Sequence, residues 1–155
     1  MTPAINAAKK AKINFQIHEY SHDAAHESYG LEAAEKMGIA TEQVFKTLVV
    51  NLDNQFLAVG IVPVSSQLSM KRIAKALGAK KAQMAEPHAV EKSTGYVLGG
   101  VSPLGQKKRL KTVIDSSAGH YPTIYVSAGR RGLEIELKLD DLVRLTQAIK
   151  TDICQ

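Results

Sequence analysis

The chain has 155 residues and a formal net charge of +5, with 20 Lys and Arg against 15 Asp and Glu. A chain of this length can bury a sizeable core as one domain. No apolar run approaches the ~20 residues that a membrane helix needs. The single cysteine excludes an internal disulfide. We therefore expect one soluble domain over residues 1–155, without membrane contact, in the reducing cytoplasm.

The basic residues are clustered along the chain. Clustered Lys and Arg favour a partner that carries phosphate groups, because neutralising phosphates releases condensed counterions. The alternative is a solvated basic face without any partner. The clusters span residues 9–12, 71–75, 80–81, 107–111 and 130–131. Charge therefore suggests a nucleic acid partner but does not decide between these readings.

The N-terminal part of the chain predicts a helix, a strand and a second helix. Thr2 can cap a helix that begins with a proline and continues through residues 4–12, which are rich in helix formers. Residues 15–20 alternate like a half-buried strand. Residues 31–37 follow as a helix that Gly38 ends.

Two apolar runs in the middle of the chain predict a β-hairpin. Residues 46–52 and 55–62 are separated by Asp53 and Asn54, a pair that favours the tight turns of hairpins. A helix over residues 70–77 is then expected. Its N-cap is Ser66 or Ser69, and Gly78 ends it.

The last part of the chain mixes strands and helices. A helix is expected from Pro87 to Gly95, and a final amphipathic helix over residues 142–149 is expected to be capped by Asp140 or Asp141. The strand candidates between them are residues 111–115, 123–127 and 133–138. This order predicts an α+β fold with a mixed, partly closed, barrel-like β-sheet flanked by helices.

Several familiar active sites do not fit the sequence. His22 and His26 have the i, i+4 spacing of zinc proteases, but Asp23 replaces the glutamate base and no third ligand is evident. Ser102 lies in a loop that resembles a nucleophile elbow, yet proline follows the serine. Cys154 lies near a terminus expected to fray, so it is a poor nucleophile candidate. The sequence thus predicts neither a metal nor a cofactor.

Lys46 and the glycine loop around residues 99–105 remain as candidate site elements. Lys46 precedes an apolar strand, where its ammonium can meet a phosphate or an oxyanion at a pocket rim, or can extend along the surface into solvent. Gly99 and Gly100 permit positive φ or close approach of a ligand, and free N–H groups there can bind an anion. The alternative for this loop is an ordinary tight turn.

Three segments carry a resemblance to a known family. They are Phe45-Lys46-Thr47-Leu48 with its hairpin, the loop Gly99-Gly100-Val101-Ser102-Pro103-Leu104-Gly105, and residues 125–134. Together they resemble the YbaK family, free-standing relatives of the editing domain inserted in bacterial prolyl-tRNA synthetase. The resemblance implies a mixed-sheet domain that deacylates mischarged tRNA, with Cys-tRNA(Pro) as the expected substrate.

The resemblance also implies which residues form the site. The strand lysine of the family corresponds to Lys46, and its G-x-x-x-P loop corresponds to Gly99 through Pro103. The implied catalytic residues are Lys46, Gly99 and Gly100. The implied substrate-binding residues are Tyr20, Tyr29, Val101, Ser102, Pro103, Ser127, Gly129 and Glu134. The family often has Asp near the position of Glu134, which makes a carboxylate role there plausible.

An aminoacyl ester is an activated acyl group, so positioning and charge stabilisation can suffice for its cleavage. We expect Lys46 to hold the phosphate or ribose of the terminal adenosine, and the N–H groups of Gly99 and Gly100 to face the ester carbonyl. A cysteinyl substrate can supply its own thiol as nucleophile. The alternatives are an Ala-tRNA(Pro) deacylase that uses water, and a non-catalytic tRNA- or nucleotide-binding module. The expected partners are the acceptor end of tRNA(Pro) and prolyl-tRNA synthetase, and the expected state is a monomer.

Overall fold

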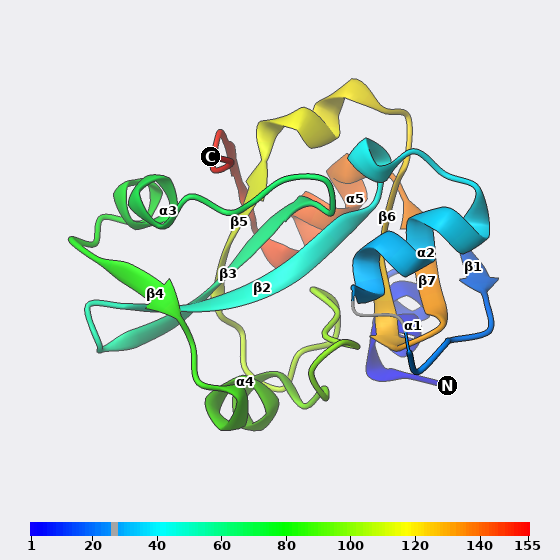
Figure 1. The fold of residues 1–155 in the computed structure, drawn as a ribbon, viewed down its shortest axis with the longest axis horizontal. Helices are drawn as coiled ribbons and strands as arrows, with labels where there is room; N and C mark the ends of the chain where they lie inside the picture. The colour runs from blue at the N-terminus through cyan, green and yellow to red at the C-terminus, as the bar shows by residue number, and fades with distance from the viewer. Residues whose placement is uncertain (26–27) are drawn as a thin grey trace.

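The strands of the computed structural model, which describes residues 1–25 and 28–155, form two sheets (Figure 1). The smaller sheet is antiparallel. Its strands, in spatial order, are β1 (Phe15–Glu19), β7 (Leu133–Leu137) and β6 (Ile124–Arg130). The larger sheet is mixed. Its strands, in spatial order, are β4 (Ala82–Met84), β2 (Phe45–Leu52), β3 (Phe56–Pro63), β5 (Lys111–Asp115) and β8 (Ile149–Thr151).

The two sheets approach each other where β2 begins. Val44 and Tyr125 form an isolated parallel bridge there, which links the start of β2 to β6. Within the described residues neither sheet closes on itself, so the α+β class with a mixed sheet is confirmed but the partly closed, barrel-like sheet is not.

Helices flank both sheets. They are α1 (Pro3–Lys10), α2 (Tyr29–Met37), α3 (Met70–Ala76), α4 (Pro87–Thr94) and α5 (Leu139–Thr146), with short 3₁₀ turns at Thr41–Gln43 and Ser116–His120. In Figure 1, α2 lies in front of β6 and β7. No helix in the described ranges is long and apolar enough to cross a bilayer.

Local capping explains most helix ends. The Thr2 side chain accepts a hydrogen bond from the Ile5 N–H at 3.2 Å, and the Ser69 side chain accepts one from the Arg72 N–H at 3.1 Å, as expected for N-caps. Gly38 and Gly95 end α2 and α4 in the left-handed conformation. These predicted helices are confirmed, with Ser69 and not Ser66 as the cap of α3.

The hairpin between β2 and β3 is also confirmed. Asp53 and Asn54 both have positive φ, 54° and 56°, which the tight turn requires. The turn sets the register of the pair, so that Leu52 lies opposite Phe56 and the start of β2 lies opposite the end of β3.

Three expectations for the C-terminal region are wrong: the cap of the last helix, the end of that helix and the fraying of the terminus. The helix ends at Thr146, and Ile149 begins β8. Lys138 is the N-cap residue of α5, and Asp140 and Asp141 lie inside the first turn, where their charges favour the positive end of the helix dipole. The chain after α5 does not fray: β8 pairs with β5, and Ile153 is fully buried. The Ile153 carbonyl accepts from the Ser69 N–H at 2.7 Å, which ties the C-terminal segment to α3.

The main core lies between the two sheets. One face of the larger sheet, including Val59 and Ile61, packs with residues of the smaller sheet such as Val126 and Ile135. The opposite face of the larger sheet packs against α3. A third cluster forms where Ala33 and Ala34 of α2 pack on Val44, Val64 and Tyr125. The junction of the two sheets is therefore covered by α2.

Candidate functional site

A cavity of about 510 Å³ opens at this junction. Its walls come from the start of β2, the N-terminus of α2, the segment between β4 and α4, the glycine loop, and strands β6 and β7. The residues predicted from the sequence that line it are Tyr20, Tyr29, Lys46, Gly99, Val101, Ser127 and Glu134. The fold thus collects in one place residues that lie far apart in the chain.

Gly99 is placed where no other residue fits without displacement. Its φ is +88°, and a Cβ there would lie 2.5 Å from Arg131 Nε and 2.6 Å from a ring carbon of Tyr29. Gly100 does not line the cavity, and its N–H donates to the Val97 carbonyl at 3.0 Å. The Gly99 N–H, by contrast, has no acceptor among the residues that the structure describes. Of the two predicted backbone donors, Gly99 is the one left available.

The other predicted loop residues shape the site from outside the cavity. Ser102 is fully buried, and its hydroxyl accepts from the Leu104 N–H at 3.2 Å. Pro103 lines a separate surface groove beside α1. Gly129 has a φ of +112° and packs closely against Tyr96. Ser102 and Pro103 belong to the loop and Gly129 to β6, and none of the three lines the cavity.

Lys46 lies on the face of β2 that it shares with Val44 and Leu48. Val44 packs beneath α2 and Leu48 packs toward α3, so the lysine lies between these two apolar clusters. Burial lowers the pKa of its ammonium, and no ion pair joins it to any described residue. Lys46 therefore presents an uncompensated cation to the cavity.

Glu134 is the buried acid of the site. The strand register places His18 and Ser127 directly opposite it on its two neighbouring strands. Glu134 is only 6% exposed, and burial raises its pKa to about 8. Burial and the nearby Glu134 together raise the pKa of Tyr20 to about 12. Both groups are therefore mainly protonated at neutral pH and can donate hydrogen bonds.

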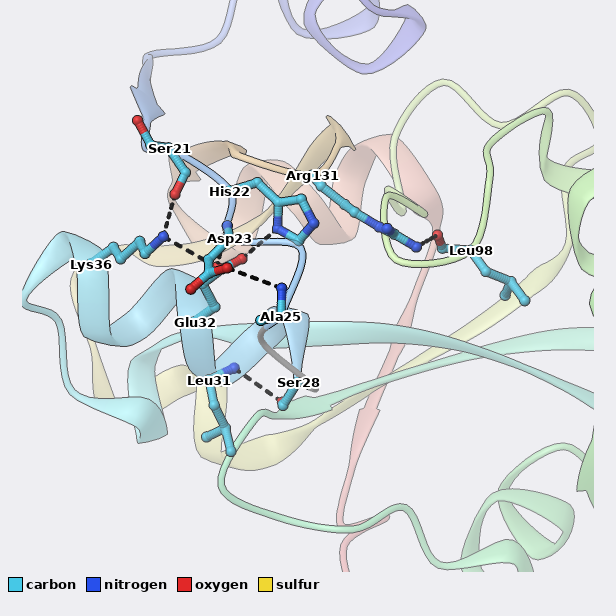
Figure 2. Close-up of polar contacts among 10 residues, drawn as sticks. All are labelled: Ser21, His22, Asp23, Ala25, Ser28, Leu31, Glu32, Lys36, Leu98 and Arg131. Carbon is cyan, nitrogen blue, oxygen red and sulfur yellow. Dashed lines mark hydrogen bonds and ion pairs between the residues drawn. The ribbon is translucent and has the colours of Figure 1, made fainter.

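A second buried acid, Glu32 of α2, joins this helix to the segment that follows Tyr20 (Figure 2). Its carboxylate accepts hydrogen bonds from His22 Nδ1 at 2.6 Å and from the Asp23 N–H at 2.7 Å, and it pairs with Lys36 Nζ at 3.2 Å. Burial opposes ionisation, but these contacts outweigh it and lower the pKa of Glu32 to about 2. They hold the segment after Tyr20 against α2.

This network was not evident from the sequence. His22 and Asp23 were considered there only as part of a metal-ligand spacing, and His26 lies outside the described residues. Thr47 was also missed: it lines the cavity, and its buried hydroxyl has no hydrogen-bond partner among the described residues. Its one sequence signal is its position directly after Lys46.

Among the residues that the structure describes, the site has no strong nucleophile. The titratable residues that line the cavity are Tyr20, Tyr29, Lys46 and Glu134. Cys154 does not line it, and burial together with a hydrogen bond to Asp115 raises the pKa of its thiol to about 11. The arrangement can hold an activated acyl group, offer a backbone N–H to an oxyanion and exchange a proton, but it cannot readily supply an attacking group.

Comparison with known proteins identifies relatives of this chain. The family model for the aminoacyl-tRNA editing domain matches residues 25–145. The chain is 36% identical over 145 residues, covering 94% of it and 88% of the relative, to a protein of Enterococcus faecalis named "Putative Cys-tRNA(Pro)/Cys-tRNA(Cys) deacylase EbsC". It is 30% identical over 129 residues, covering 79% of it and 77% of the relative, to the "Multifunctional Ser/Thr-tRNA deacylase ProXp-y" of Escherichia coli.

The fold also matches a solved structure. The structure described as a "putative trans-editing enzyme for prolyl tRNA synthetase" superposes with a TM-score of 0.86 at 22% identity, covering 99% of this chain and 95% of the other. At this identity the likeness shows the α+β fold.

Proposed function

The chain belongs to the aminoacyl-tRNA editing domain family, and on that basis we propose that it deacylates mischarged tRNA in trans, in the cytoplasm, with Cys-tRNA(Pro) as its substrate. The observation that carries the proposal is the cavity itself. It brings the Lys46 cation, the free Gly99 N–H and the buried Glu134 carboxyl together, and none of the described residues that line it is a strong nucleophile. Such a site suits a substrate that is already activated.

In the proposed complex the aminoacyl group enters the cavity and its ester carbonyl faces the Gly99 N–H. That N–H stabilises the negative charge that develops on the carbonyl oxygen during attack. Lys46 anchors the ribose or phosphate of the terminal adenosine as a point charge. The apolar residues Val101 and Val90 of the lining surround a small side chain such as that of cysteine.

Two routes can complete the reaction. In the first, the cysteinyl thiol attacks its own ester carbon: a C–S bond forms, the bond to the ribose oxygen breaks, and the thiol proton passes to that oxygen to give a thiolactone and free tRNA. In the second, water attacks and the ionised form of Glu134 accepts its proton. A pKa near 8 suits Glu134 to such proton transfer. The thiol route is our proposal for Cys-tRNA(Pro), because proximity alone lowers much of its barrier.

A deacylation panel tests the function. Purified protein is mixed with tRNA(Pro) charged with cysteine, alanine, serine or threonine, and loss of the amino acid is followed under single-turnover conditions. The thiol route predicts that the cysteinyl ester reacts far faster than the other three. Equal rates would exclude the thiol route, and faster loss of serine and threonine would place the chain with its Escherichia coli relative.

A non-catalytic tRNA-binding module would instead show salt-sensitive binding with no loss of amino acid from any substrate. Repeating the panel with prolyl-tRNA synthetase present tests the proposed partner. A synthetase that helps select tRNA(Pro) should increase the rate on Cys-tRNA(Pro) more than on Cys-tRNA(Cys). Gel filtration of the protein alone tests the proposed monomer.

A further inference from the structure

Arg131 lies at the rim of the cavity. It follows β6 in the turn toward β7, and its side chain is exposed. Its guanidinium carbon lies 4.0 Å from the centroid of the Tyr29 ring. Its Nη2 donates to the Leu98 carbonyl at 3.2 Å (Figure 2). Tyr29 and Leu98 both line the cavity. Arg131 thus connects the α2 side of the cavity mouth to the glycine-loop side.

The glycine loop accommodates this arginine. A Cβ at Gly99 would lie 2.5 Å from Arg131 Nε, so a side chain at this position would displace the guanidinium from the Tyr29 ring. Stacking on one residue and a hydrogen bond to another hold the guanidinium in one place before any ligand arrives. A cation that is ordered in advance loses less freedom on binding than a solvated one.

Most N–H groups of the Arg131 guanidinium have no acceptor among the described residues. One of its N–H groups bonds to the Leu98 carbonyl, and no carboxylate among the described residues pairs with it. Its charge is therefore uncompensated at the mouth of a cavity that already holds the Lys46 cation. The planar fork of a guanidinium matches the paired oxygens of a phosphate group.

The choice of phosphate rests on the function proposed above. When the aminoacyl ester occupies the cavity, the terminal adenosine lies at its mouth and the chain of the tRNA leaves over the rim. We propose that Arg131 binds the phosphodiester on the 5′ side of the terminal adenosine. Lys46, inside the cavity, is then left to act on the ribose and ester end of the substrate.

Arg130 provides a matched control. It is the adjacent residue, carries the same charge and is also exposed, but it does not line the cavity, and no described residue stacks on or hydrogen-bonds to its side chain. Arg131→Ala is expected to raise the half-saturating concentration of Cys-tRNA(Pro) about three- to tenfold, as for one exposed charged contact. The saturating rate should stay within about twofold, and the slope of log affinity against log salt should fall by about 0.7. Arg130→Ala should change the half-saturating concentration less. If the two variants had equal effects, Arg131 would contribute only its charge and no specific phosphate contact, and the proposal would be overturned.

Inhibition by adenosine 5′-monophosphate and by adenosine separates a phosphate contact from a structural role. The 5′-phosphate of the monophosphate stands in for the phosphodiester. In the wild type and in Arg130→Ala the monophosphate should inhibit deacylation more strongly than adenosine does, and in Arg131→Ala the two should inhibit equally. The proposal fails if the wild type does not distinguish them, or if Arg131→Ala weakens adenosine as much as the monophosphate. An inactive wild type would instead refute the proposed function.

Discussion

Replacing Glu134 with glutamine should stabilise the protein at neutral and alkaline pH, because glutamine cannot carry the buried charge. Burial raises the pKa of this carboxyl from 4.5 to about 8. At about 1.36 kcal/mol for each pH unit, the buried acid lowers the free energy of unfolding by about 3 kcal/mol at pH 7 and by about 5 kcal/mol above pH 8. Glutamine has nearly the same shape and stays neutral, so it should avoid this loss.

The direction of the pH dependence follows from proton binding. Below pH 4.5 the carboxyl is protonated in both the folded and the unfolded chain, and its contribution to stability is fully present. Between pH 4.5 and about 8 the unfolded chain releases the proton while the folded chain keeps it, so stability falls as the pH rises. Above about pH 8 both states are ionised and the loss stays constant.

Urea unfolding at about pH 5 and about pH 9 measures the effect. Glu134→Gln should differ from the wild type by less than about 1 kcal/mol at the lower pH, and should be more stable by about 5 kcal/mol at the higher pH. Glu136→Gln is the matched control on the same face of β7. Burial opposes ionisation of Glu136, but hydrogen bonds from Thr123 and His18 outweigh it and lower its pKa, so its removal should destabilise the protein at neutral pH. A stability difference for Glu134→Gln that is the same at both pH values would refute the reasoning.

Three further predictions concern the site and its support. Lys46→Ala should lower the single-turnover rate on Cys-tRNA(Pro) by about 100-fold or more while the thermal midpoint shifts by only about 2 °C; near-full activity would remove Lys46 from the site. Glu32→Gln should lower the free energy of unfolding by about 3 kcal/mol at pH 7 in urea, because it leaves His22 and Lys36 without their buried partner. That difference should shrink as the pH falls from 4.5 toward 2, the range over which the wild-type carboxylate becomes protonated. Cys154→Ser should keep deacylation within about twofold, and Cys154 should react slowly with iodoacetamide at pH 7, since its thiol is protonated.

Local features of the fold could be predicted from the sequence. Ser69 caps α3, and Asp53 with Asn54 turns the β2–β3 hairpin, because each feature depends on hydrogen bonds and φ preferences within a few residues. The three-residue strands β4 and β8 were missed, since each exists only through pairing with a neighbouring strand, β2 or β5. The separation into two sheets depends on the same long-range pairing.

In the site, too, some features have local sequence signals and others depend on tertiary structure. Lys46 and the glycine loop have sequence motifs, and both contribute to the cavity. The family resemblance singles out Glu134, but nothing in the alternating run Leu133–Leu137 itself distinguishes it from Glu136, the other acidic residue of that run. In the structure Glu134 is 6% exposed and lines the cavity, whereas the Glu136 side chain is 20% exposed and does not line it. Burial of one of two equivalent acids is a tertiary property that no local pattern encodes.

The buried acid Glu134 also helps to distinguish an enzyme from a module that only binds tRNA. A module that only held a tRNA end would need cations toward the phosphates, as Lys46 and Arg131 provide. A carboxyl such as Glu134 adds no attraction for phosphate, and its burial lowers stability by several kcal/mol. Groups of this kind occur where a proton must be held or moved, as in active sites with a shifted pKa. The combination of Glu134 with the free N–H of Gly99 therefore favours an enzyme over a non-catalytic module.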